Sequence, residues 1–122
     1  MKFKEEIKEA VGAHGAWKRK LKIAIATGKI DVKVSTIKAD KQCSFGKWLY
    51  GPTITEKQKN SEHYHAVQEL HAVFHEKAAK VAQLAISGEK AHALNMLEVN
   101  GEFTVASAEL TTSMMAWLKE SQ

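Results

Sequence analysis

The sequence predicts an all-α protein, an up-and-down four-helix-type bundle with a short extra helix in the first connection. Apolar residues recur every three or four positions over three long stretches, which is the period of an amphipathic helix. Glycines follow two of these stretches, where helix C-caps belong. One proline and seven glycines are too few for a many-turned β fold. We expect residues 1–122 to form a single domain.

The first predicted helix covers residues 3 to about 27 and ends at Gly28, a suitable left-handed C-cap. His14 occupies an inward position of this helix, whereas the basic run Lys18-Arg19-Lys20 lies on its outer side. The apolar stripe consists of Phe3, Ile7, Ala10, Val11, His14, Trp17, Leu21, Ala24 and Ile25.

The first connection should contain an extended segment and then a short helix. Apolar and polar residues alternate over residues 30 to 39, which predicts a strand-like loop packed on the bundle. Asp40 can N-cap a helix over about 41–50, which Gly51-Pro52 would end. Cys43 would then lie in the first turn of this helix, where backbone N–H dipoles favour a thiolate.

Two long helices should complete the bundle. One begins at about 55 or 62, with Thr53, Thr55 or Ser61 as caps, and ends before Gly88. The other runs from about 89 to 119 and contains Gly101. Its apolar arc is broad enough to meet a partner as well as its own bundle. The arc consists of Leu94, Met96, Leu97, Phe103, Val105, Ala108, Leu110, Met114, Met115, Trp117 and Leu118.

Composition and motifs exclude several classes of protein. The net charge of +4 is spread along the chain, so we expect no nucleic-acid binding. The chain has no apolar run of about 18 residues and no apolar segment near Met1, so we expect no membrane insertion, no secretory signal and a cytoplasmic location. It has no phosphate-binding glycine loop, nucleophile elbow or His-Glu-x-x-His, so we expect no enzyme.

Four residues form a candidate metal site. His71 and His75 are four positions apart, which separates their directions by about 40° around a helix. His14 faces inward on another helix, and Cys43, the single cysteine, lies between the two. Three imidazoles and one thiolate would close a tetrahedral Zn²⁺ site. The alternative is ordinary buried, hydrogen-bonded histidines with an inert cysteine, and spacing alone leaves both open.

The other three histidines, His63, His65 and His92, are expected to be solvated surface residues. They lie near predicted helix N-termini, whose positive dipole disfavours further cationic ligands. Glu62-x-x-His65 and Glu89-x-x-His92 match the spacing of di-iron carboxylate proteins. Their place at helix ends, rather than in the middle of the bundle, argues against such a site.

Three motifs in order resemble one known family. They are His14-Gly15-Ala16-Trp17, Cys43-Ser44-Phe45-Gly46-Lys47-Trp48-Leu49 and His71-Ala72-Val73-Phe74-His75. The pattern H-x-x-W, C-x-F-G-x-W-L and H-x-x-x-H resembles the chemoreceptor zinc-binding (CZB) domain family. The resemblance covers nearly the whole chain and implies Zn²⁺ held by His14, Cys43, His71 and His75. It also implies packing around the site by Trp17, Phe45, Gly46, Trp48 and Leu49.

The resemblance implies a regulatory domain of bacterial signal transduction. Family members occur with chemotaxis receptors, with diguanylate cyclases that make cyclic-di-GMP, or alone, and commonly form homodimers. They sense zinc, or hypochlorous acid through a redox-reactive cysteine. An output domain is not part of this sequence. The alternatives are a hemerythrin-like iron or oxygen protein, although Lys18 stands where its His-x-x-x-Glu element needs a carboxylate, and a structural dimerisation bundle.

Overall fold

In a computed structural model, the structure describes residues 2–31, 33–39 and 43–120, with only the backbone described for residues 2 and 3. These residues form eight helices and no strand, which confirms the predicted all-α class. The helices are α1 (Lys2–Gly15), α2 (Trp17–Thr27), α3 (Val34–Lys38), α4 (Ser44–Leu49), α5 (Glu56–Lys59), α6 (Glu62–Ile86), α7 (Lys90–Leu97) and α8 (Glu102–Glu120).

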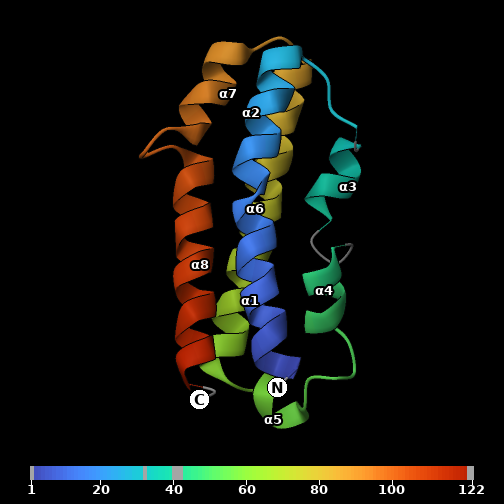
Figure 1. Cartoon of the computed structure of the whole chain (residues 1–122), viewed down its shortest axis with the longest axis vertical. Coiled ribbons are helices and arrows are strands. Elements are labelled where there is room, and N and C mark those ends of the chain that lie inside the picture. The colour runs from blue at the N-terminus through green and yellow to red at the C-terminus, as the bar shows by residue number, and fades with distance from the viewer. Residues whose placement is uncertain (1, 32, 40–42, 121–122) are drawn as a thin grey trace.

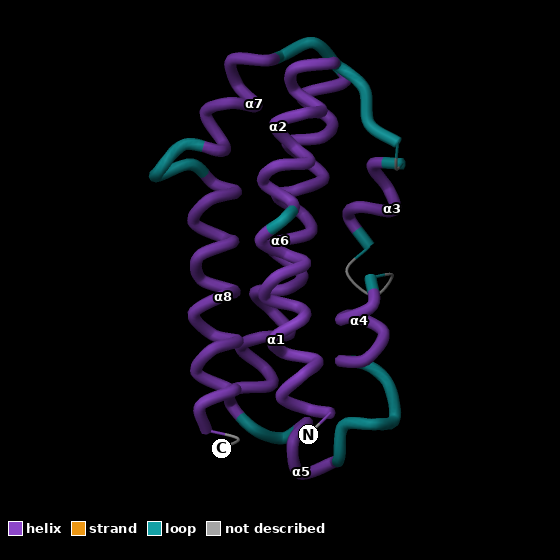
Figure 2. The backbone as a smooth tube through the Cα atoms, in the orientation of Figure 1, coloured by secondary structure: helices purple, strands orange, loops and turns teal. Residues whose placement is uncertain are grey.

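The helices form an elongated bundle whose segments run alternately up and down (Figure 1). α1 and α2 rise along the long axis, and α3 and α4 return along one side. α6 rises again, α7 and α8 descend, and both chain ends lie at the same end of the molecule. In Figure 2, loops lie at both ends of the bundle, and a further loop, between α7 and α8, projects from its side.

The core is organised on α6, which contacts α2, α3, α7 and α8. Its buried residues include Val67, Phe74, Ala78, Val81 and Ala85, spaced by three, four or seven positions as a single inward stripe requires. Phe74 packs against Phe103 of α8, with ring centroids 5.2 Å apart. This packing places the middle of α6, with its histidines, at the centre of the bundle.

The predicted helix boundaries agree with the structure where the sequence contains a clear capping residue. Ser61 caps α6 by accepting a hydrogen bond from the Tyr64 N–H at 3.1 Å. Thr55 and Gln58 form a capping box at the start of α5. Gly28 and Gly88 have φ angles of 73° and 81°, the left-handed conformation expected of them. The chain therefore ends or begins a helix at Gly28, Ser61 and Gly88, as the sequence predicts.

The first predicted helix is interrupted once. A turn at Ala16 separates α1 from α2, next to Gly15, which has low helix propensity. Hydrogen bonds from Ala16 N–H to the Gly12 carbonyl (3.1 Å) and from Lys20 N–H to the Ala16 carbonyl (3.3 Å) continue through the turn. His14 and Leu21 are consequently both buried, as the apolar stripe predicts.

The strand-like loop predicted for residues 30 to 39 is wrong over its second half. Residues 34–38 form the one-turn helix α3, which buries Ile37 against α6. A lone alternating segment has no neighbouring strand with which to pair its backbone, so a helical turn satisfies those groups instead. Cys43 is the N-cap of α4 and not part of its first turn. The predicted cap Asp40 and residue Val32 lie outside the described residues.

The last predicted helix, 89–119, is broken between Leu97 and Glu102. Gly101 lies in this break, where a Cβ atom would collide with the carbonyl oxygens of Asn95 and Met96. The break changes the helical phase, so Phe103, Leu110, Met114 and Trp117 are buried. The predicted single apolar arc is thus divided between the core and the surface.

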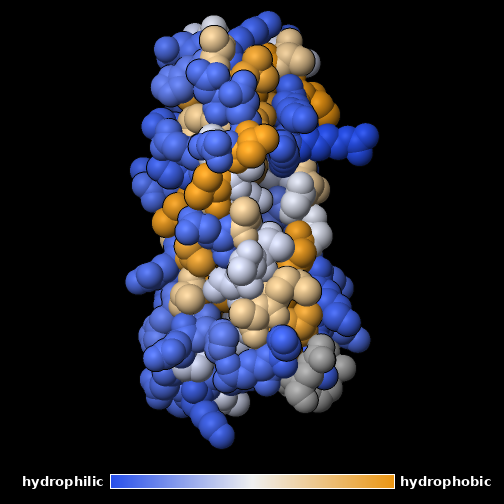
Figure 3. All heavy atoms as spheres, turned by 90° about the vertical axis from the view of Figure 1, so that its left-hand side faces the viewer, coloured by the Kyte–Doolittle hydropathy of each residue, from blue (hydrophilic) through white to orange (hydrophobic). Residues whose placement is uncertain are grey.

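The surface part of that arc faces away from the core. Leu94, Val105 and Met115 are 47%, 44% and 49% exposed. Seen from the side of α7 and α8, apolar side chains gather along the middle of the face, between hydrophilic borders (Figure 3). In the described part of the chain, no helix has the length and hydrophobicity that a membrane crossing requires.

Candidate metal centre

Three helices bring His14, Cys43, His71 and His75 together. His14 lies near the end of α1, His71 and His75 share the inward face of α6, and Cys43 caps α4. One ligand atom from each residue lies within 4.8 Å of all the others. The three imidazoles are 5% exposed or less, and Cys43 is half-buried. The structure therefore assembles the four residues that the sequence singled out.

The distances between the ligand atoms approach those of a tetrahedral zinc site. Nε2 of His71 lies 3.1 Å from Nε2 of His14 and 3.1 Å from Nε2 of His75. Sγ of Cys43 lies 3.3 Å from Nε2 of His71 and 4.0 Å from Nε2 of His14. At ordinary zinc bond lengths, tetrahedral geometry separates two nitrogens by about 3.3 Å, and a nitrogen and a sulfur by about 3.6 Å.

Backbone carbonyls orient two of the imidazoles. Nδ1 of His14 lies 2.7 Å from the carbonyl oxygen of Ala10, and Nδ1 of His75 lies 2.8 Å from that of Ile37. A carbonyl oxygen only accepts, so each Nδ1 carries the proton and donates it. Nε2 of each neutral ring then presents a lone pair to the centre, as a metal-ligating histidine requires.

The site favours neutral imidazoles. Burial lowers the pKa of His14 from its ordinary 6.5 to about 4, against the opposing effect of its Ala10 hydrogen bond. Burial also lowers the pKa of His71 to about 2, and the neighbouring His75 and His14 add to this change. These rings remain available as lone-pair donors at neutral pH.

Cys43 presents its sulfur to the same point. The Gly46 N–H donates to Sγ at 3.3 Å, which stabilises negative charge on the sulfur. Converging imidazole lone pairs repel one another, and an N–H or S–H within the cluster could satisfy only some of them. A divalent cation satisfies all four donors together. Among the described residues, the donors are three nitrogens and one sulfur without a carboxylate, a set typical of a closed structural zinc site.

Comparison with known proteins identifies the family to which the chain belongs. The family model of the chemoreceptor zinc-binding domain matches residues 14–82, more than half of the chain. The chain belongs to the chemoreceptor zinc-binding (CZB) domain family. Neither the curated proteins nor the solved structures yielded a match.

Membership agrees with the donor set and identifies zinc as the cofactor of this CZB domain. The family is a sensory zinc-binding one rather than a catalytic one. The hemerythrin-like alternative loses its support, because Lys18 is exposed on α2 and supplies no ligand.

Aromatic rings enclose the inner side of the CZB site. Phe45 on α4 lies 5.1 Å from the His71 ring and 5.9 Å from the His14 ring. Phe74 on α6 lies 5.0 Å from the His14 ring. Gly46 is buried beside Cys43, and Leu49 is 0% exposed. These residues exclude water from one side of the four ligand atoms.

Trp48 connects the site to the last helix. Its ring lies 5.6 Å from Phe45 and 6.1 Å from Trp117 on α8. The Tyr64 hydroxyl donates to the Leu49 carbonyl at 2.8 Å, which fixes the end of α4. A displacement of α4 would therefore change the packing of Trp117 at the carboxyl end of α8.

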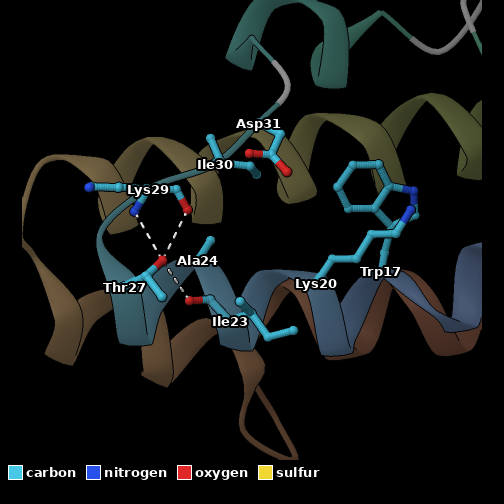
Figure 4. Close-up of a pocket in the computed structure, with 8 residues that line it drawn as sticks. All are labelled: Trp17, Lys20, Ile23, Ala24, Thr27, Lys29, Ile30 and Asp31. Atoms are coloured by element: carbon cyan, nitrogen blue, oxygen red, sulfur yellow. Dashed lines mark hydrogen bonds between the residues drawn. The ribbon is translucent and has the colours of Figure 1, made fainter.

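Trp17 lies farther out than the expected packing role suggests. It is half-buried, with the Lys20 ammonium 4.9 Å from its ring centre. It lines a hollow of about 530 Å³ with Ile23 and Ile30, shown in Figure 4, and a second hollow that reaches Cys43. Trp17 thus lies near the surface between the two hollows, and its ring does not stack on the imidazole of another described residue.

The remaining histidines lie outside the centre. His63 is half-buried and pairs with Glu120, while His65 and His92 are exposed. The sequence reasoning did not find the carbonyls of Ala10 and Ile37, because a backbone acceptor has no signature in residue type. The available signal was the alternation over residues 30 to 39, which indicated only that this segment packs on the bundle.

Proposed function

We propose that this CZB domain holds one zinc ion with His14, Cys43, His71 and His75 and reports the state of that site to a signalling partner. The observation that carries the proposal is the convergence of these four ligand atoms within 4.8 Å, with two rings anchored through Nδ1. Bound zinc would supply a positive charge that joins α1, α4 and α6. Residues 1–122 would act as one domain.

Cys43 is the proposed responding residue. It is the single cysteine, the least buried of the four ligands, and the one that two-electron oxidants attack. In the reaction with hypochlorous acid, the thiolate sulfur loses two electrons and gains the hydroxyl group, and chlorine leaves as chloride. The resulting sulfenic acid has less negative charge on sulfur, so Cys43 loses its hold on the ion.

Release of Cys43 would free α4 and so alter α8. α4 is held by the Cys43 contacts, by the Tyr64–Leu49 hydrogen bond and by the packing of Trp48 on Trp117. Removing the first of these loosens the first turn of a six-residue helix, whose other restraints are the buried Phe45 and Leu49, the Tyr64 hydrogen bond and Trp48. A change in α4 would then reach the end of the chain through Trp117.

The proposed signalling partner belongs to a bacterial signalling complex that controls either chemotaxis or cyclic-di-GMP synthesis. A reducing cytoplasm suits a zinc-bound thiolate, which an oxidising compartment would oxidise.

The exposed apolar face formed by Leu94, Val105 and Met115 is the proposed homodimer surface. Met115→Glu should then convert the dimer to a monomer in light scattering, whereas Ala26→Glu on exposed α2 should not.

An oxidant titration tests the proposal. Zinc-loaded protein is treated with hypochlorous acid, and released zinc, Cys43 oxidation by mass spectrometry and helix content by circular dichroism are followed together. We expect zinc release in proportion to Cys43 oxidation. Full retention of zinc after Cys43 has been oxidised would overturn the proposed redox response.

A further inference from the structure

A hollow of about 500 Å³ opens from the surface onto the site. We call it the outer hollow. Cys43 and His14 line it, together with Glu6, Glu9 and Ala13 of α1 and Trp17 of α2. The outer hollow is distinct from the one shown in Figure 4, although Trp17 and Lys20 border both.

Of the four site residues, Cys43 is the most accessible from the outer hollow. His14, His71 and His75 are 5%, 0% and 3% exposed, whereas Cys43 is half-buried. Phe45 and Phe74 lie against the imidazoles on the inner side. A molecule that enters the outer hollow therefore meets the cysteine sulfur before it meets the rings of His71 or His75.

The charges around the outer hollow are mainly negative. Glu6 and Glu9 are one helical turn apart on α1, and neither forms an ion pair with another described residue. Lys20 is the cation at this border, and its ammonium lies over the Trp17 ring. Among the described residues that line the outer hollow, two carboxylates and one ammonium leave an excess of negative charge beside Cys43.

We propose that the outer hollow is the route to Cys43 and that Glu6 and Glu9 select against anions on this route. The proposal rests on the proposed function, in which Cys43 is the responding residue. Neutral oxidants and cations would reach the sulfur more readily than anionic oxidants. Since Glu9 is exposed and Glu6 is only half-buried, salt limits the discrimination to about three- to tenfold at low ionic strength.

Methanethiosulfonate reagents of three charges test the selectivity. The cysteine thiolate attacks the reagent's sulfenyl sulfur, a mixed disulfide forms and methanesulfinate leaves, so the chemistry is the same for each charge. The single cysteine makes the reaction specific. Rates are measured on metal-free protein and divided by the rates with free cysteine. We expect the order cationic, neutral, anionic, with a difference that shrinks as salt is added.

Paired variants separate the local effect from net charge. Glu6→Gln with Glu9→Gln should raise the ratio of anionic to neutral rates by about threefold or more. Glu69→Gln with Glu76→Gln removes the same charge from exposed positions of α6 and should leave the ratio unchanged. An equal ratio in both double variants would overturn the selection by Glu6 and Glu9.

A bulky substitution tests the route itself. Ala13 is exposed and borders the outer hollow, so Ala13→Trp should slow even the neutral reagent by about fivefold or more. Ala26→Trp, at an exposed position of α2, should leave the rate unchanged. An unchanged rate in Ala13→Trp would show that reagents reach Cys43 elsewhere. These rates are measured on metal-free protein. A negative result for the route is therefore distinguishable from a failure of the protein to bind or release zinc.

Discussion

The Nδ1–H of His75 on α6 donates a 2.8 Å hydrogen bond to the backbone carbonyl of Ile37 on α3. The Ile37 side chain is 2% exposed and anchors α3 against α6. One buried side chain therefore positions the acceptor that orients an imidazole of the proposed zinc site. This couples the packing of a one-turn helix to the proposed metal centre.

Ile37→Ala should weaken zinc binding through this acceptor. The cavity should cost about 2–5 kcal/mol of unfolding free energy, as for other buried Ile→Ala changes. Loss of a hydrogen bond that orients a ligand should lower zinc affinity by about 10- to 100-fold. Competition with a chromogenic chelator measures the affinity.

Ile25→Ala is the matched control, because Ile25 is 3% exposed in α2 and is not an acceptor for a ligand. It should lower stability similarly but leave zinc affinity within about threefold. Equal losses of affinity in the two variants would contradict the specific role of α3.

The metal-free protein should lose stability as pH falls below 6.5. The unfolded chain protonates its histidines there, whereas the folded pKa values of His14 and His71 are about 4 and about 2. Each of these two histidines then lowers the unfolding free energy by about 1.4 kcal/mol for every pH unit below 6.5. The effect of His14 ends near pH 4, and that of His71 continues to lower pH. Urea unfolding at pH 7, 6 and 5 measures this.

His14→Gln should remove part of that pH dependence, whereas His65→Gln, at an exposed position, should retain it. A slope that is the same in the two variants would show that His14 does not titrate as its burial requires.

Gly101→Ala should destabilise the protein by about 1–3 kcal/mol, because the new Cβ would meet the carbonyls of Asn95 and Met96 in the α7–α8 break. Gly12→Ala, on α1 where the added methyl group would meet open space, should instead stabilise by about 0.5–1 kcal/mol. Thermal unfolding of both variants tests the break, and stabilisation by Gly101→Ala would contradict it.

Zinc removal should change the emission of Trp48. Its ring packs on Phe45 and Trp117, and α4 is capped by the ligand Cys43. Chelation should loosen α4, expose the indole and shift emission to longer wavelength. Trp48→Phe should lose most of that shift, whereas Trp17→Phe should keep it. A shift that survives in Trp48→Phe would place the movement elsewhere.

Local signals explain what the sequence could predict. Ser61, Gly88 and the three-and-four spacing between them define α6 without tertiary information. The inward positions of His71 and His75 follow from that helix. The arrangement around Cys43 was available from the family resemblance. Its place near a helix start followed from Asp40 as the predicted cap, with Gly51 and Pro52 marking the end of the same helix.

Tertiary effects explain what it could not. The alternation before Ile37 fits a strand, but a helical turn forms where the side chain docks on α6. The break at Gly101 is concealed because apolar spacing continues on both sides of it with a change of phase. The acceptor at Ile37 is a backbone carbonyl, which any residue would supply.

The central claim is most directly tested by zinc content after purification in excess zinc and gel filtration. We expect about one zinc per chain in the unchanged protein, and less than about 0.2 in Cys43→Ala, His14→Ala, His71→Ala and His75→Ala. His65→Ala and His92→Ala, at exposed positions, should retain about one. Less than about half a zinc in the unchanged protein, or full zinc in all four ligand variants, would contradict the account.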